Sequence, residues 1–143
     1  MHSNEELAAL AVELIAAGSH FTRAAYQASG MELSNVSMRA LAALEREPGL
    51  RIGQLAAREG IRQPSMSQAM KRLVNDGYAA RHTADDDARA TALTITDAGR
   101  EVLRNYRAAA AEAVAPVFEP LKPEDVATLK RAAELLPELT AEL

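Results

Sequence analysis

Apolar residues recur every three or four positions along most of the chain, which is the spacing of one face of an α-helix. The first such stretch covers residues 4–28, where only Gly18 interrupts a composition typical of helices. Its apolar stripe consists of Leu7, Leu10, Leu14, Ala17 and Phe21. Gly30–Met31 is the expected break. The pattern therefore predicts a long N-terminal helix with one apolar face.

A second helix is expected to begin after Ser34 or Asn35, either of which can cap it. Pro48–Gly49 ends it, because both residues disfavour continued helix. Its buried face is expected to comprise Met38, Leu41, Ala42 and Leu44. Residues 50–52 are then expected to form a short extended segment. The helix before this segment is therefore a separate element of the core.

Two helices separated by a glycine follow. Residues 53–60 form a short helix that ends at Gly60, which readily takes the left-handed backbone conformation that stops a helix. Pro64 fits the first turn of the next helix, where its missing N–H costs nothing, and this helix runs to Gly77. Its apolar stripe is Met66, Ala69, Met70 and Leu73. This is the layout of a helix-turn-helix.

The hydrophobic period changes after Gly77. Residues 78–83 and 91–96 are short, β-branched and alternating, with three aspartates between them. This pattern predicts a β-hairpin. Asp85 and Asp86 are expected to be turn formers at its solvated tip.

A long helix is expected after the hairpin, with Thr96 or Asp97 as its cap. Gly99 in the first turn is expected to lower the stability of this helix slightly. Pro116 and Pro120 limit the far end of the helix.

The last helix opens at Pro123 and carries Glu124 and Asp125 at its positive end. Its apolar face is Val126, Leu129, Ala133 and Leu136. The first helix and the last two are long and amphipathic, and so small a unit offers them no internal partner. We therefore expect them to pack together and across a dimer.

Length and composition narrow the class of protein. A chain of 143 residues suits one compact domain or one protomer of an interlocked dimer. It has no cysteine, which excludes disulfides, thiolate metal sites and cysteine redox sensing. No apolar run reaches the roughly 18 residues of a membrane span, and Glu5, Glu6 and Glu13 stand where an export signal needs basic residues. We expect a cytoplasmic protein without a cofactor.

The charge is unevenly distributed. The whole chain has a net charge of −4. Residues 62–82 nevertheless carry four basic residues against one acidic residue, a net +3, whereas residues 112–143 carry three against seven, a net −4. Attraction of a polyanion depends on the local field, so the basic segment that contains the second helix of the helix-turn-helix is the candidate DNA-binding surface.

That helix begins with small, hydrogen-bonding side chains that can enter the major groove, which is about 12 Å wide. Gln68 can pair with adenine, and Arg62 with guanine or a phosphate. Lys71 and Arg72 are better placed for phosphates. The candidate DNA-binding residues here are Arg62, Gln63, Pro64, Ser65, Ser67, Gln68, Lys71 and Arg72. Taken alone, the pattern also fits an ordinary amphipathic surface helix.

Three segments together resemble the MarR family of winged helix-turn-helix transcriptional regulators over nearly the whole chain. They read LSNVSMRALAAL, IGQLAAREGIRQPSMSQAMKRLVNDGYAAR and DDARATALTITDAGREVL. The family's wing signature is Asp-x-Arg, then an alternating strand ending in Leu-Thr-x-x-Gly. Here it reads Asp87-Ala88-Arg89 and Ile95-Thr96-Asp97-Ala98-Gly99, with isoleucine in place of leucine.

The resemblance implies a mainly α (α+β) fold. Residues 31–99 would form a winged helix-turn-helix DNA-binding lobe, and residues 1–30 with 100–143 would form dimerisation helices. Each protomer of the homodimer would place its recognition helix in a major groove of a pseudo-palindromic operator. Arg89 matches the wing arginine of the minor groove, and Asp87 the aspartate that braces the wing. Asp87 would orient Arg89 or pair with Arg81.

The wing departs from the family pattern at two positions. Many relatives have a basic residue where this chain has Ala88, and another where it has Thr91. We therefore expect the wing to hold DNA with less charge, and Arg89 to matter more.

Other kinds of site fit the sequence poorly. Adjacent aspartates on a strand point to opposite faces, and no calcium-loop pattern surrounds Asp85–Asp87. His2, His20 and His82 are far apart and lack the spacing of a zinc site. No phosphate loop or catalytic signature is present. We expect neither a metal site nor enzyme activity.

A small-molecule pocket is a further expectation from the resemblance. Relatives bind phenolic or aromatic acids between the dimer helices and the DNA-binding lobe. The matching candidates are His20, Arg23, Tyr26, Met31 and Met38. Taken one by one, the methionines also fit a core and Arg23 an exposed surface.

The sequence thus predicts a dimeric regulator that binds double-stranded DNA, acts as a repressor and responds to a small aromatic or phenolic ligand. The alternative is a winged-helix module that kept the fold for protein–protein interaction and lost DNA binding. The acidic net charge of the chain and the smaller number of basic residues in the wing leave that alternative open.

Overall fold

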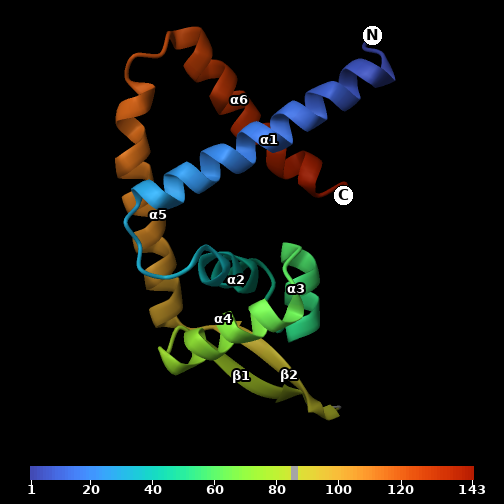
Figure 1. Ribbon diagram of the computed structural model, residues 1–143, viewed down its shortest axis with the longest axis vertical. Coiled ribbons are helices and arrows are strands. Elements are labelled where there is room, and N and C mark those ends of the chain that lie inside the picture. The colour runs from blue at the N-terminus through green and yellow to red at the C-terminus, as the bar shows by residue number, and fades with distance from the viewer. Residues whose placement is uncertain (85–86) are drawn as a thin grey trace.

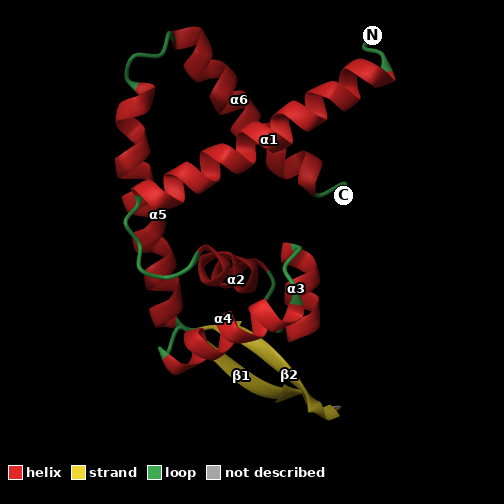
Figure 2. Cartoon of the chain, viewed as in Figure 1, coloured by secondary structure: helices red, strands yellow, loops and turns green. Residues whose placement is uncertain are grey.

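The computed structural model describes residues 1–84 and 87–143, and the side chains of residues 84–90 lie outside the described part. Within this part the chain forms six helices and one antiparallel hairpin (Figure 1, Figure 2), so the fold is mainly α, as predicted. The elements are α1 (Asn4–Ala28), α2 (Asn35–Arg46), α3 (Ile52–Glu59), α4 (Gln63–Asn75), β1 (Ala79–Ala84), β2 (Asp87–Ile95), α5 (Asp97–Phe118) and α6 (Pro123–Thr140). No described helix is long and apolar enough to cross a membrane.

The helix ends follow the local chemistry of the sequence. The Ser34 hydroxyl accepts a hydrogen bond from the backbone N–H of Ser37 at 3.1 Å and so caps α2. Gly60 ends α3 in the left-handed conformation, with φ at 61°. Pro64 lies in the first turn of α4, and Arg62 is the residue that precedes this helix. These three predictions are confirmed, so α3 and α4 form the expected helix-turn-helix.

The buried core lies in one part of the chain, which we call the lobe: residues 33–103, comprising α2, α3, α4, the hairpin and the start of α5. Every apolar residue that is buried among the described residues lies within it. The predicted stripe of α4 supplies four of these residues, Met66, Ala69, Met70 and Leu73. Predicted face residues Met38, Leu41 and Leu44 of α2 are buried too, whereas Ala42 is half-buried. Because α4 is held on this apolar base, its opposite face is free.

The hairpin is present. β1 has the predicted length but begins and ends one residue later than predicted, whereas β2 begins four residues earlier and ends one residue earlier than predicted. Ala79 pairs with Ile95, and the ladder continues to Thr83 opposite Thr91. Thr96, which ended the predicted strand and was also one of the two predicted caps of the next helix, caps α5 by accepting from the N–H of Gly99 at 3.1 Å. The predicted extended piece is real only in part, because Leu50 bridges Leu93 but Ile52 is already the first residue of α3.

Gly99 is a requirement rather than a mild cost. The N–H of Thr96 donates to the carbonyl oxygen of Tyr78 at 3.1 Å, which brings the first turn of α5 against the end of the helix-turn-helix. A Cβ at Gly99 would collide with that same carbonyl oxygen and would lie 2.9 Å from Cγ1 of Ile95. Only glycine permits this approach, so the close packing outweighs the small propensity penalty that the sequence predicted.

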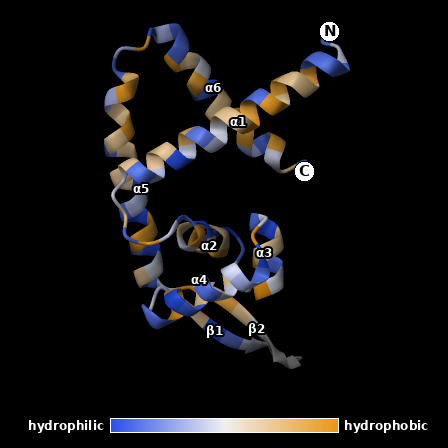
Figure 3. Cartoon of the chain, in the orientation of Figure 1, coloured by the Kyte–Doolittle hydropathy of each residue, from blue (hydrophilic) through white to orange (hydrophobic). Residues whose placement is uncertain are grey.

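The rest of the molecule stands away from the lobe (Figure 1), and we call it the arms: α1, α6 and α5 beyond Tyr106. Neither α1 nor α6 has a buried residue. Their apolar faces are visible as runs of hydrophobic residues (Figure 3). The exposed large apolar side chains are Met1, Leu7, Leu10, Val12, Leu14, Ile15, Phe21, Val117, Phe118, Val126, Leu129, Leu136, Leu139 and Leu143.

Candidate nucleic-acid interface

The outward face of α4 is polar and accessible. The predicted stripe of core residues fixes which way the helix faces, so Pro64, Gln68 and Lys71, spaced by four and three, share the opposite side. Among the predicted contacts, Ser67 is half-buried, at the flank of the helix. The exposed ones are Arg62, Gln63, Pro64, Ser65, Gln68, Lys71 and Arg72. The structure thus brings most of the predicted set onto one surface.

Three cations of the α4 and hairpin surface have no ion-pair partner among the described side chains. These are Arg62, Lys71 and Arg81. Most other arginines of the lobe and arms are paired, in Arg39–Glu59, Arg46–Glu59, Arg58–Glu47, Arg100–Asp97, Arg107–Glu45 and Arg131–Glu134. Unneutralised cations around an exposed helix suit a surface that meets phosphates.

Arg72 is an exception on α4. Its Nε lies 3.9 Å from a carboxylate oxygen of Asp76 one turn later. It also borders a cleft formed with the loop between α1 and α2, where Met31 and Leu33 lie. A half-neutralised arginine at the end of the helix is less suited to phosphate contact than Lys71, so Lys71 is the stronger candidate of the two.

The hairpin projects from the lobe beside α4 (Figure 1), in the position of a wing. Arg81 is exposed on β1 and stands opposite Leu93. The backbone of Asp87 and Arg89 lies in β2, but their side chains are outside the described part, as are Asp85 and Asp86 altogether. The roles of Arg89 in the minor groove and of Asp87 in bracing therefore stay predictions.

Ion pairs fasten α3 to α2. Two nitrogens of the Arg58 guanidinium each lie 3.1 Å from an oxygen of Glu47, a two-bond arrangement. The hydrogen bond from Arg58 lowers the pKa of Glu47 below its usual 4.5, and the same bond raises the pKa of Arg58. At neutral pH both groups are therefore charged, and the pair helps to hold the short helix that precedes the recognition helix.

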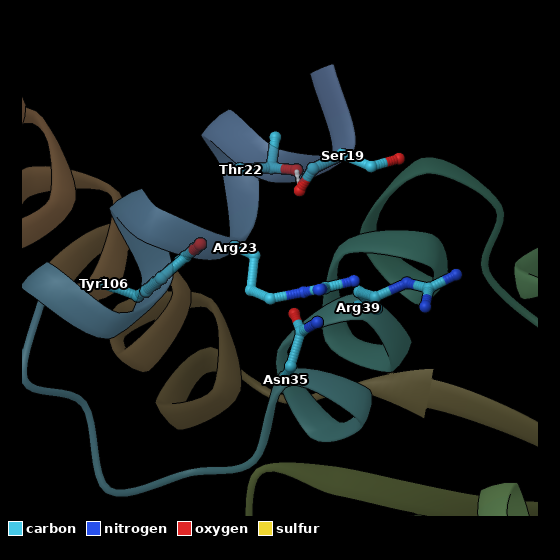
Figure 4. Close-up of a pocket in the computed structure, with 6 residues that line it drawn as sticks. All are labelled: Ser19, Thr22, Arg23, Asn35, Arg39 and Tyr106. Atoms are coloured by element: carbon cyan, nitrogen blue, oxygen red, sulfur yellow. Dashed lines mark hydrogen bonds between the residues drawn. The ribbon is translucent and has the colours of Figure 1, made fainter. Parts of the chain in front are cut away.

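A polar crevice separates the arms from the lobe (Figure 4). It has a volume of about 430 Å³ and is lined by Ser19, Thr22, Arg23, Asn35, Arg39 and Tyr106, from α1, α2 and α5. Arg23 extends from α1 across the crevice towards α2 (Figure 4). The lining offers hydroxyl, amide and guanidinium donors, which together suit an anionic ligand.

Of the five residues predicted to line a ligand pocket, the structure places only Arg23 in this crevice. Tyr26 packs beside Tyr106, with ring centroids 6.0 Å apart, and its hydroxyl donates to the carbonyl of Leu33. Met38 is in the core at 2% exposure. Met31 lines the separate cleft beside Arg72, and His20 is exposed on α1 outside the crevice lining.

Part of the observed crevice lining could have been predicted from the sequence. Ser19, Thr22 and Arg23 are spaced by three and four, and Asn35 and Arg39 by four, so each set shares one face of its helix. Each of these two helix faces is a polar stripe with apolar residues on both sides. Tyr106 had no such signal, because only the packing of α5 against α1 brings it there. Among the described side chains no cluster of three or more histidine, aspartate or glutamate residues could hold a metal ion.

Known proteins resemble this chain in sequence and fold. The sequence model of a protein family, described as MarR family, matches residues 29–90. An HTH-type transcriptional regulator of Mycobacterium leprae is 31% identical over 114 residues, which cover 80% of this chain and 78% of that protein. A solved transcriptional regulator from Pseudomonas aeruginosa has a TM-score of 0.75 at 24% identity, with 98% of both chains covered. A MarR family regulator from Silicibacter pomeroyi has a TM-score of 0.58 at 28% identity, covering 90% of this chain and 86% of that one.

Proposed function

Because the chain belongs to the MarR family of transcriptional regulators, and is thus a non-enzymatic DNA-binding regulator, we propose that it acts as a homodimeric repressor whose DNA affinity is modulated by a small ligand. The observation that carries the proposal is the polar outward face of α4: Lys71 on this face and Arg62, just before the helix, are exposed without carboxylate partners among the described side chains. Nothing on this face favours the alternative of a protein–protein module without DNA binding.

The exposed polar face of α4 supports an assignment of the recognition residues. Gln68 and the serines meet base edges in the major groove, and Arg62 and Lys71 meet phosphates on either side. Arg89 of the wing enters the adjacent minor groove, where narrow A·T-rich sequence attracts an arginine. Two such units bind half-sites one helical turn apart, at roughly 34–36 Å. A dimer seated across a promoter in this way blocks transcription.

The dimer is supported by the arms. Soluble monomers rarely expose large contiguous apolar patches, yet α1, α6 and the end of α5 expose many leucine, valine, isoleucine and phenylalanine side chains. An apolar groove of about 770 Å³ runs between Phe21, Phe118 and Leu129. A second copy of the chain, with its arms laid against these, would cover both.

We carry over the predicted domain division, with residues 31–99 as the DNA-binding region and residues 1–30 with 100–143 as the dimerisation region. The lobe as defined by its buried core, residues 33–103, extends a few residues into the second region. Leu103 of α5 is 1% exposed and belongs to the core of the lobe, so α5 is the element shared by both regions. A ligand in the crevice at Arg23 lies at this junction, and it would alter the spacing of the two recognition helices.

Fluorescence anisotropy with duplex DNA from the region flanking the protein's own gene tests the proposal. We expect tight binding that weakens steeply with salt, because several phosphates are neutralised. Arg89→Ala should weaken binding at least about tenfold, the cost of one good groove contact. The matched control is Arg131→Ala, which removes a paired arginine of α6 and should leave affinity unchanged. No binding at low salt would exclude the proposed function.

A further inference from the structure

Arg51 lies between the recognition helix α4 and the hairpin but belongs to neither element. The N–H of Leu93 in β2 donates to the carbonyl oxygen of Leu50 at 2.9 Å, and the N–H of Gly49 donates to the carbonyl oxygen of Leu93 at 2.9 Å. Arg51 follows this bridge directly, and α3 begins at the next residue. The chain therefore passes from the edge of the hairpin into the helix-turn-helix through Arg51.

The start of α3 also lies against the start of α4. Helix α3 contacts both α4 and β2, and it stands at the beginning of α4, above the hairpin, in Figure 1. A Cβ added at Gly53 would lie 3.6 Å from Oε1 of Gln63, the first residue of α4. Because Gly53 is in the first turn of α3, directly after Arg51 and Ile52, the backbone of Arg51 is held close to both elements that the proposed function places on DNA.

The side chain of Arg51 faces solvent. Its backbone is extended, with φ at −82° and ψ at 158°, and successive side chains of an extended chain point to opposite sides. Leu50 is buried at 4% exposure, so Arg51 points outwards, and it is exposed. The N–H of Arg51 donates to Oε1 of Gln54 at 2.9 Å, which fixes the backbone from which the guanidinium extends. No carboxylate lies within salt-bridge distance of this guanidinium among the described side chains.

The two grooves of a DNA duplex are separated by a sugar–phosphate strand. With α4 in the major groove and the tip of the hairpin in the adjacent minor groove, this strand has to pass between α4 and the hairpin. The first helix of a helix-turn-helix crosses the backbone, and Arg51 stands at the start of that helix. A guanidinium can give a phosphate two parallel hydrogen bonds. Arg51 is thus placed to meet the strand between the grooves.

The hairpin supplies little charge for this strand. Between residues 79 and 95 the sequence has two arginines, Arg81 and Arg89. Arg81 lies on β1, which is not the strand that bridges Leu50, and in the proposed function Arg89 reaches into the minor groove. The strand between the grooves therefore needs a cation from outside the hairpin, and Arg51 lies beside β2.

We propose that Arg51 binds the phosphate between the major-groove contacts of α4 and the minor-groove contact of the hairpin, and so fixes both elements on the same stretch of duplex. Arg51 is then a DNA-binding residue outside both the recognition helix and the wing. A phosphate contact adds affinity and fixes position but reads no base. The proposal rests on the proposed function, because it adds a contact to the same DNA complex.

The first measurement is the salt dependence of DNA affinity, by fluorescence anisotropy, on a duplex from the region flanking the protein's own gene. Arg51→Gln should bind about tenfold more weakly than the wild type, the scale of one hydrogen bond to a charged group. It should also lower the slope of log affinity against log salt by about one. Arg51→Lys keeps the charge and should keep the wild-type slope. A role confined to holding α3 would change the affinity without changing the slope.

Arg104→Gln is the matched control. Arg104 is exposed two turns into α5 and has no carboxylate within salt-bridge distance among the described side chains. Its loss removes the same charge from a surface that faces neither groove in the proposed complex. This variant should keep both the affinity and the slope of the wild type.

The second measurement locates the contact on the DNA. Uncharged methylphosphonates replace the phosphates of the same duplex one at a time. The wild type should lose affinity at several positions, and Arg51→Gln should be insensitive at one of them. Lys71→Gln, on the outward face of α4, should be insensitive at a different one.

The proposal is overturned if Arg51→Gln keeps the wild-type slope, or if Arg104→Gln lowers the slope equally. It is also overturned if Arg51→Gln stays sensitive to every methylphosphonate that weakens the wild type. These results leave the proposed function intact, because the wild type still binds DNA. A wild type that binds no DNA at low salt overturns both.

Discussion

The lobe and the arms are built from similar amphipathic helices, yet they differ in where their apolar faces lie. In the lobe, α4 buries Met66, Met70 and Leu73 against neighbours from the same chain. In the arms, α1 carries an equally regular stripe of leucines that meets no covering element. The lobe is thus complete in one chain, and the uncovered stripe on α1 supports the proposal that a partner covers the arms. Each prediction below separates these two kinds of apolar surface.

The largest effect is expected from charges placed on the arm. Leu10 and Leu14 are 57% and 42% exposed in the single chain, so Leu10→Lys with Leu14→Lys should not unfold the lobe. Two buried lysines at a dimer interface should instead prevent association. Operator affinity should then fall at least about a hundredfold, because the second half-site no longer benefits from linkage. Analytical ultracentrifugation and anisotropy measure the two results.

Glu13→Gln on the same helix is the matched control for that double variant, and it should stay dimeric. If the double variant also stays dimeric and binds the operator normally, the arms are not the dimer interface.

A substitution in the lobe should act on folding instead. Leu73 is fully buried, and its replacement by alanine should lower the free energy of unfolding by roughly 2–5 kcal/mol. The loss should appear as a lower urea midpoint. Leu129→Ala, on the exposed face of α6, should cost little within the monomer and should show its effect mainly as weaker association. Equal losses of monomer stability at both sites would remove the distinction between lobe and arms.

Substitutions at two glycines test the same difference between the lobe and the arms. Gly99→Ala forces a Cβ against the carbonyl oxygen of Tyr78, and overpacking of this kind should cost about 1–3 kcal/mol. Gly18→Ala in the arm meets no atom within 4 Å and should stabilise α1 by roughly 0.5–1 kcal/mol. Thermal unfolding of both variants measures the contrast. A neutral Gly99→Ala would mean that α5 does not approach the helix-turn-helix so closely.

The smallest effect concerns the exposed pair of Glu47 and Arg58. Because the folded protein lowers the pKa of Glu47, this carboxyl adds stability above its unfolded pKa of 4.5, and the gain disappears as the pH falls through the lower folded value. Glu47→Gln should therefore be slightly less stable than the wild type at neutral pH and equal to it in strong acid. Urea unfolding at several pH values tests this, and a difference that grows towards acid contradicts it.

Sequence patterns were sufficient where the controlling interaction is local. The order of elements, the stop at Gly60, the caps at Ser34 and Thr96 and the buried stripe of α4 all depend on residues close together in the chain. The family resemblance also follows from local motifs, and the comparisons with known proteins confirm it.

Sequence reasoning did not suffice where distant segments meet. Gly99 looked like a propensity cost because its neighbour, the Tyr78 carbonyl, lies in a different element. The crevice lining differs from the predicted pocket for the same reason, since Tyr106 and Arg39 reach it only through the packing of α5 and α2. Arg39 shares a polar helix face with Asn35, but its link to Glu59 could not be predicted, because the two residues are twenty positions apart in the sequence.

The central claim is that the cations left without carboxylate partners around α4 neutralise DNA phosphates. The most direct measurement is the salt dependence of operator affinity for the wild type and for Arg62→Ala with Lys71→Ala, compared with Arg131→Ala as the paired control. We predict that the double variant lowers the slope of log affinity against log salt by about two, one for each lost phosphate contact, and that the control keeps the wild-type slope. An unchanged slope in the double variant would contradict the account.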